Sequence, residues 1–250
     1  MSDYDTTHDI ASPDREAAVR TDDVWKVFEH EGISVEAVRG VTLRIDPGEF
    51  VVLAGPSGSG KTTLLNVIGG LTRPTRGRVW VDEAEITDMS SKDLARLRLA
   101  KVGFVFQAYN LLPVLTALEN AEFSLLLQGA ATEERRRRVE ELFQRMGISG
   151  LESRRPAKLS GGQQQRVAIA RAVVGQPALV LADEPTANVD SVTSEALIDL
   201  MAQLNHELGT TFVFATHDTE LMRRAKRLVR LVDGAIASDE TRENNHTGPG

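Results

Sequence analysis

The 250-residue sequence predicts an α/β fold that carries an inserted α-helical segment. In the second half of the chain, apolar runs of strand length alternate with helical stretches, as expected of a parallel sheet covered by helices. Short β-branched runs precede this alternation and indicate an N-terminal antiparallel β-subdomain. Residues of about 108–175 are almost wholly helical in pattern, so we expect an α-helical subdomain inserted between two strands of the core.

The first part of the chain holds five short β-branched runs, each of which predicts a strand: Val24–Phe28, Val35–Val38, Val41–Ile45, Glu49–Ala54 and Arg78–Val81. The turn residues Asp46-Pro47-Gly48 separate the third run from the fourth. Because a turn signal between two such runs favours a hairpin, we expect that pair to be antiparallel neighbours.

Four later apolar runs predict buried strands: Val102–Phe106, Ala178–Ala182, Thr211–Ala215 and Leu228–Val232. Three stretches have helical spacing: Thr62–Gly69, Gln164–Val174 and Ser194–Glu207. A further helix, running to Met146, carries a charged run in which Glu133–Arg137 and Glu134–Arg138 are (i, i+4) pairs. We interpret that run as a solvated helix face and not as a patch for lipid or nucleic acid.

We expect one folded domain over residues 23–238, between disordered tails over residues 1–22 and 239–250. Within the domain, residues 23–107 and 176–238 would form the core, and residues of about 108–175 the helical subdomain.

Charge and composition exclude several classes of function. The net charge is −7, and the acidic excess is concentrated before Val24, so the rest of the chain lacks the basic surplus of a nucleic-acid-binding protein. The absence of cysteine excludes disulfides, thiolate metal sites and a cysteine nucleophile. The N-terminus lacks the apolar segment of a secretory signal, and the apolar runs are shorter than the ~20 residues of a membrane span. We therefore expect neither nucleic acid as a partner nor direct membrane insertion.

The segment Gly55-Pro56-Ser57-Gly58-Ser59-Gly60-Lys61-Thr62-Thr63 follows a predicted strand and opens a predicted helix. This is the pattern and the context of a phosphate-binding loop, in which glycines let backbone N–H groups point inward at a helix N-terminus. Lys61 would reach the β- and γ-phosphates, and the Thr62 hydroxyl is a hard oxygen ligand suited to Mg²⁺. The segment predicts a P-loop NTPase core, with a flexible Gly/Ser loop as the alternative.

Two adjacent carboxylates, Asp183 and Glu184, end the apolar run Leu179–Ala182. Side chains alternate along a strand, so neighbouring acids at its end can diverge toward different tasks. Phosphoryl transfer requires one group that holds Mg²⁺ and one that orients and deprotonates the attacking water. We assign the first task to Asp183 and the second to Glu184; without the phosphate loop, a solvated strand end would be the alternative.

A second glycine-containing motif, Leu159-Ser160-Gly161-Gly162-Gln163, precedes a helical stretch and provides another anion cradle. Followed by Gln164-Gln165-Arg166-Val167-Ala168-Ile169-Ala170-Arg171-Ala172, this motif resembles the signature of the ATP-binding cassette (ABC) family. The resemblance implies the ABC ATPase fold, ATP and Mg²⁺ as ligands, and a head-to-tail, ATP-dependent homodimer. In such a dimer Ser160, Gly161, Gly162 and Gln163 of one copy would cap the γ-phosphate held by the phosphate loop of the other.

The resemblance covers residues of about 23–236 and implies further roles. Gln107 looks like the glutamine that touches Mg²⁺ and the attacking water. His217 looks like the switch histidine that hydrogen-bonds the γ-phosphate, although a lone histidine at a strand end can also be structural. Asp190 falls in the loop of dimer contacts. Phe28 is the candidate for stacking on adenine, with Trp25 as its competitor, and because stacking reads little of base identity GTP is an open alternative.

The stretch Phe106–Asn120 resembles that of ABC ATPases that release lipoproteins or export macrolides, a group that includes the cell-division ABC ATPase. In that group a separate polytopic membrane permease docks beside this segment, which implies a cytoplasmic, ATP-hydrolysing subunit held at the inner face of the cell membrane. Four apolar side chains would anchor the permease, or alternatively pack in the helical subdomain: Tyr109, Leu111, Leu112 and Leu115. An importer subunit, and a non-transport ABC ATPase acting on DNA or ribosomes, are the alternative functions.

Overall fold

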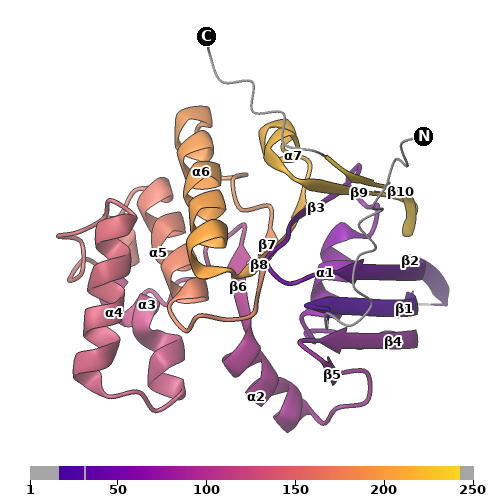
Figure 1. Cartoon of the computed structure of the whole chain (residues 1–250), viewed down its shortest axis with the longest axis horizontal. Helices are drawn as coiled ribbons and strands as arrows, with labels where there is room; N and C mark the ends of the chain where they lie inside the picture. Colours follow the sequence, from indigo (N-terminus) through magenta and orange to yellow (C-terminus); the bar gives the residue numbers. More distant parts are fainter. Residues whose placement is uncertain (1–16, 31, 243–250) are drawn as a thin grey trace, which may run out of the picture.

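The computed structural model describes residues 17–30 and 32–242, whose strands form two sheets (Figure 1). The four-stranded antiparallel sheet has the order β2-β1-β4-β5 and comprises β1 (Val19–His30), β2 (Ile33–Ile45), β4 (Arg76–Val81) and β5 (Ala84–Glu85). The six-stranded sheet has the order β10-β9-β3-β8-β7-β6 and comprises β3 (Phe50–Ala54), β6 (Val102–Phe106), β7 (Leu179–Asp183), β8 (Thr211–Thr216), β9 (Arg227–Val232) and β10 (Ala235–Thr241). Strands β3 and β6 to β9 are parallel, and β10 runs antiparallel to β9.

Helix α1 (Lys61–Ile68) lies between the two sheets and joins them in one hydrophobic core. A second core covers the opposite face of the six-stranded sheet, where helices α3 (Ala117–Leu127), α4 (Thr132–Arg145), α5 (Gly161–Val173) and α6 (Ser191–Leu208) pack. Strand β3 serves both cores by alternation, because Val51 and Leu53 face one core and Val52 faces the other. The expected α/β fold with an antiparallel β-subdomain is thus confirmed.

Three more helices complete the described part of the chain: α2 (Ser91–Lys101), the 3₁₀ helix η1 (Pro156–Lys158) and α7 (Thr219–Arg224). The sequence pattern predicted none of α2, α7, β5 and β10. Over residues 17–30 and 32–242, every helix is too short or too polar to cross a bilayer.

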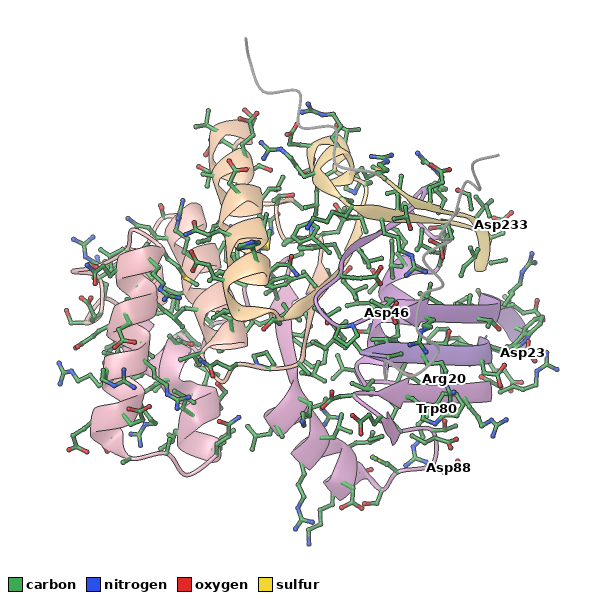
Figure 2. The ribbon with its side chains drawn as sticks, viewed as in Figure 1. Arg20, Asp23, Asp46, Trp80, Asp88 and Asp233 are labelled. Atoms are coloured by element: carbon green, nitrogen blue, oxygen red, sulfur yellow. The ribbon has the colours of Figure 1, made fainter. Side chains whose placement is uncertain are left out.

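The turn at residues 46–48 is the clearest correction to the expected topology. It does not close a hairpin, because β2 pairs with β1 in one sheet whereas β3 pairs with β8 and β9 in the other. The two runs expected as separate strands before it form the single strand β2. Asp46, which is labelled in Figure 2, therefore marks the place where the chain passes from one sheet to the other.

Both expected tails contribute residues to the sheets. Strand β1 begins at Val19, which is fully buried between its partners Ile45 and Val81, and Arg20 stacks on Trp80 with its guanidinium carbon 3.7 Å from the ring centre (Figure 2). Strand β10 likewise continues to Thr241. Residues 1–16 and 243–250, expected to be disordered, lie outside the described residues, and the division of the domain at residues 107 and 176 stays a prediction.

Helix α4 carries the predicted charged face with one changed pairing. Arg138 contacts Glu134 at 2.6 Å, as the (i, i+4) spacing predicts. Arg137 instead contacts Glu134 and Glu141, and not Glu133. Arg135 differs from the rest of the run, because its partner is Glu122 on α3, at 3.2 Å. The run is therefore neutralised partly within α4 and partly by α3.

A candidate phosphate-binding site

The phosphate loop, residues 55–63, opens onto a pocket of ≈ 510 Å³ at the carboxyl edge of the six-stranded sheet. The pocket is lined by Ala37, Ser57, Gly58, Ser59, Gly60, Lys61, Thr62, Thr63, Gln107, Glu184 and His217. The loop follows β3, and Gln107, Glu184 and His217 follow β6, β7 and β8. Because these strands are parallel, their carboxyl ends meet at one edge and bring together residues that are far apart in sequence.

Two glycines allow the phosphate loop to curl against its surroundings. Gly60 has φ +96°, and a Cβ there would lie 2.2 Å from the Ala37 carbonyl oxygen. Gly55 has φ +154°, and its Cβ would lie 2.3 Å from the Leu231 carbonyl oxygen. Lys61 begins α1 and is 7% exposed; its Nζ donates to the carbonyl oxygens of Gly55 at 2.8 Å and Pro56 at 2.9 Å. The lysine is thus held at the mouth of the loop, beside the helix N-terminus.

Asp183 lies next to the hydroxyl that the sequence assigned to Mg²⁺. The Thr62 Oγ1 donates to Asp183 Oδ1 at 2.8 Å. Burial raises the pKa of Asp183, the neighbouring charge of Glu184 raises it further, and the Thr62 hydrogen bond and Lys61 oppose the shift. Thr62 and Gln107 line the pocket, and Asp183, which is not among the lining residues, adjoins it through the Thr62 hydrogen bond. The hydroxyl, amide and carboxylate oxygens of these residues are hard donors, which fit Mg²⁺.

Glu184 is held in one orientation by the last residue of β8, Thr216, and by His217, which follows it. The Thr216 Oγ1 donates to Glu184 Oε2 at 2.8 Å, and the His217 Nδ1 lies 2.7 Å from Oε1. The residue has φ +45°, a left-handed conformation that turns it away from the path of β7. The Glu184 side chain is 18% exposed, whereas that of His217 is 75% exposed. The arrangement presents a fixed carboxylate to the pocket with an accessible histidine at its rim.

Sequence reasoning missed Thr216 and Ala37 as parts of this site. Thr216 precedes His217 directly, so a hydroxyl beside a candidate histidine was an available signal. Ala37 contributes a backbone carbonyl from the other sheet, for which its side chain gives no indication.

The signature motif, residues 159–163, lies at the start of α5 and is not among the residues that line the phosphate pocket. The Ser160 Oγ accepts from the Gln163 backbone N–H at 3.3 Å, and the Gln163 Oε1 accepts from the Ser160 N–H at 2.9 Å. A Cβ on Gly162 would lie 2.6 Å from the Thr193 Cγ2, so glycine permits close packing there. Ser160 itself is exposed.

Asp190 and Phe28 also lie outside the lining of the pocket. Asp190 caps α6 by accepting from the Thr193 N–H at 3.0 Å and its hydroxyl at 2.7 Å. Phe28 is 46% exposed, with the Lys26 ammonium 4.9 Å from its ring centre. Its competitor Trp25 is already engaged, because its indole N–H donates to Asp23 at 2.8 Å.

Comparison with known proteins adds to this geometry. Residues 38–187 match the family described as ABC transporter. The chain belongs to this family. An uncharacterized ABC transporter ATP-binding protein of Thermotoga maritima is 48% identical to it, over 88% of this chain and 94% of that protein.

Other ABC relatives have more specific names. The lipoprotein-releasing system ATP-binding protein LolD of Pseudomonas fluorescens is 43% identical over 86% of this chain and 95% of its own length. The macrolide export ATP-binding/permease protein MacB of Syntrophobacter fumaroxidans is 44% identical over 87% of this chain, which spans only 31% of that longer protein.

The fold matches a solved ABC cassette, MJ0796, at 42% identity. Its dimeric post-hydrolysis structure with ADP and Pi superposes with a TM-score of 0.83 over 89% of this chain and 98% of that one. A second dimeric structure of the same cassette gives a TM-score of 0.84. The ABC ATPase fold expected from the sequence is therefore confirmed.

Proposed function

We propose that this chain binds and hydrolyses Mg²⁺–ATP as the nucleotide-binding subunit of an ABC transporter. The observation that carries the proposal is one pocket that is lined by Ser57 to Thr63 of the phosphate loop, Glu184 and His217, and that adjoins Asp183 through its hydrogen bond with Thr62. Each group needed for phosphoryl transfer by positioning and charge neutralisation has a residue of suitable chemistry there.

The phosphate loop would bind the triphosphate through its backbone N–H groups, with Lys61 reaching the β- and γ-phosphates. Thr62, Asp183 and Gln107 would hold Mg²⁺, which when bound neutralises charge on the phosphate oxygens. Phe28, exposed near the end of the β1 strand, is the proposed platform for adenine.

Glu184 would accept a proton from the attacking water. Its two hydrogen-bonding neighbours support this role, because a general base must be held in the orientation that reaches the water. His217 would hold Glu184 through Nδ1 and, being largely exposed, contact the γ-phosphate through its other ring nitrogen. Lys61 and His217 would then stabilise the transferring phosphoryl group.

We further propose that the site is completed by a second copy of the chain. Ser160, Gly161, Gly162, Gln163 and Asp190 lie away from the phosphate pocket of their own chain, and Ser160 and Asp190 are exposed. A head-to-tail dimer would bring these residues to the pocket of the partner, with one Mg²⁺–ATP at each of two interfaces. The dimeric structures of MJ0796 support this arrangement.

A membrane permease is the proposed partner, docked beside residues Gln107–Asn120. An apolar groove of ≈ 380 Å³ lies between β6 and α3, with Phe104, Phe106, Phe123 and Leu127 among its lining residues. Of the four anchors expected from the sequence, Leu112 is 41% exposed, whereas the other three are half-buried and Leu111 packs on the core. Phe104, Phe106 and Phe123 in the groove are half-buried as well, whereas Leu127 is 58% exposed. The groove therefore adds Leu127, which the sequence did not suggest, to Leu112 as a proposed anchor.

The process that ATP hydrolysis would drive is, in our proposal, export, lipoprotein release or force transmission. The chain would act at the inner face of the membrane. The names of the LolD and MacB relatives support this proposal. Import remains the alternative for the same chemistry.

A pull-down tests the proposal. Tagged Glu184→Gln protein should hydrolyse ATP orders of magnitude more slowly than the parent, and with Mg²⁺–ATP it should capture its partner from detergent-solubilised membranes of the source cell. The matched control adds Leu127→Glu, which charges the groove and should abolish capture while preserving ATP binding.

A captured polytopic protein with a large extracytoplasmic domain would support the proposed direction, and a permease with a solute-binding protein would indicate import. Recovery of DNA or ribosomal components alone would refute the transporter role.

A further inference from the structure

Tyr109 and Asn110, which follow Gln107 closely in the chain, adopt an unusual backbone conformation. Tyr109 has φ +59° and Asn110 has φ +49°, consecutive left-handed positions that a bulky side chain such as tyrosine seldom adopts. Arg171 on α5 holds both, since its guanidinium donates to the Tyr109 carbonyl at 2.9 Å and to the Asn110 carbonyl at 2.6 Å. The chain after Gln107 is thus fixed to the helix that begins with the signature motif.

This conformation directs the Tyr109 side chain to the loop of residues 187–190. The Tyr109 hydroxyl donates to the Asn188 carbonyl at 3.1 Å. In return, the Asn188 side-chain Nδ2 donates to the Gln107 carbonyl at 2.8 Å. Two hydrogen bonds of opposite direction therefore join the two segments. Burial raises the pKa of Tyr109, so its hydroxyl keeps the proton that it donates.

The same hydroxyl touches the start of the signature helix. A Cβ on Gly161 would lie 2.9 Å from the Tyr109 Oη, and 3.4 Å from the Asn188 carbonyl oxygen. Tyr109 lies two residues after Gln107 in the chain. It therefore links the segment that follows Gln107 to both the loop of residues 187–190 and the signature motif.

We propose that Tyr109 is a positioning residue that orders the loop of residues 187–190 for contact with a second copy of the chain. This inference rests on the dimer in the proposed function. Ala187 and Asn188 are exposed, so without the hydroxyl the loop would keep more conformational freedom before association. An interface that must first order a loop binds more weakly than one that is already ordered.

The test uses the two tyrosines of the chain in the Glu184→Gln background, with Tyr4, outside the described residues, as the matched control. Tyr109→Phe removes only the hydroxyl. In the nucleotide-free chain, we expect amide hydrogen exchange over residues 186–190 to be faster in Tyr109→Phe than in Tyr4→Phe. With Mg²⁺–ATP, we expect the dimer dissociation constant to rise about two- to tenfold, the loss of one net hydrogen bond, while nucleotide affinity of the monomer is unchanged.

Asn188→Asp provides a second variant, because it keeps the size of the side chain and removes the Nδ2 donor. Its effect on exchange should be smaller in the Tyr109→Phe chain than alone if the two bonds act as a unit. Equal exchange and equal dimerisation in Tyr109→Phe and Tyr4→Phe would overturn the inference. A Glu184→Gln parent that stays monomeric with Mg²⁺–ATP would instead refute the proposed dimer, and with it the role of Tyr109 in dimer contact.

Discussion

Replacing Thr216 by valine removes one of the two groups that orient Glu184. The side chain is fully buried, and valine keeps its shape, so the packing of β8 is preserved. Two hydrogen bonds are lost: the one that Thr216 donates to Glu184 at 2.8 Å and the one that it accepts from the Asp218 N–H at 3.0 Å. A hydrogen bond to a charged group contributes about 1.5–3 kcal/mol, equivalent to about 10–100-fold in rate if the whole contribution is felt in the transition state.

Because His217 still holds the other oxygen, we expect the lower end of this range, about a tenfold fall in kcat. The KM for ATP should not change, since Thr216 is not among the residues that line the phosphate pocket. In a chain that already carries Glu184→Gln, the change should have little further effect, because both substitutions disable the same base.

Thr211→Val is the matched control, at the opposite end of the same strand. Its hydroxyl accepts from the Gly48 N–H at 3.0 Å, far from the carboxylates, and it is 1% exposed. Steady-state hydrolysis and thermal unfolding of both variants separate loss of orientation from loss of stability. If Thr216→Val and Thr211→Val had the same kcat, the hydroxyl would have no part in orienting Glu184.

Two further predictions concern the phosphate pocket. Lys61→Ala should weaken ATP binding at least about tenfold, because it removes a cation that can reach the phosphates. Lys92→Ala, on the exposed face of α2, is the control and should leave ATP binding unchanged. Titration with a fluorescent ATP analogue measures both affinities, and an unchanged affinity in Lys61→Ala would contradict the assignment of the loop. Asp183→Asn should stop Mg²⁺-dependent hydrolysis but raise the melting temperature of the nucleotide-free chain near neutral pH. The pKa of Asp183 is raised in the folded chain from its ordinary 3.8. As the pH rises above 3.8, the unfolded chain therefore loses this proton before the folded chain does. The free energy of unfolding falls in consequence as the pH rises through the folded pKa. The gain from Asp183→Asn should therefore shrink as the pH approaches 3.8, and a gain independent of pH would contradict this explanation.

The local parts of the site could be predicted because their chemistry is contiguous in sequence. The phosphate loop needs glycines, a lysine and a hydroxyl in a fixed order between a strand and a helix, and all of them lie within residues 55–63. Asp183 and Glu184 can likewise be recognised locally, because they are two charged residues at the end of an apolar strand. The signature motif could be found in the same way, with its own capping serine and glycines.

Partners that are distant in sequence were beyond such reasoning. Thr216 and Glu184 are 32 residues apart, and Tyr109 and Asn188 are 79 residues apart, yet each pair is in hydrogen-bond contact. The residues next to Thr216 and Tyr109 in the sequence form no pattern from which their hydrogen-bond partners could be predicted. The groove beside β6 was missed for the same reason, because its lining includes residues of α2, β6, α3 and α5.

The sequence by itself determined the α/β fold, the phosphate loop and the pair of carboxylates, since short-range periodicity and local chemistry are properties of contiguous residues. Only the tertiary structure decided that the turn at residues 46–48 connects two sheets, that Val19 belongs to the first strand, and that Thr216 orients Glu184. The physical reason is that strand pairing and side-chain contacts depend on which distant surfaces are buried together. In this protein, α1 and strands of both sheets share one hydrophobic core, so which surfaces are buried depends on residues from distant parts of the chain.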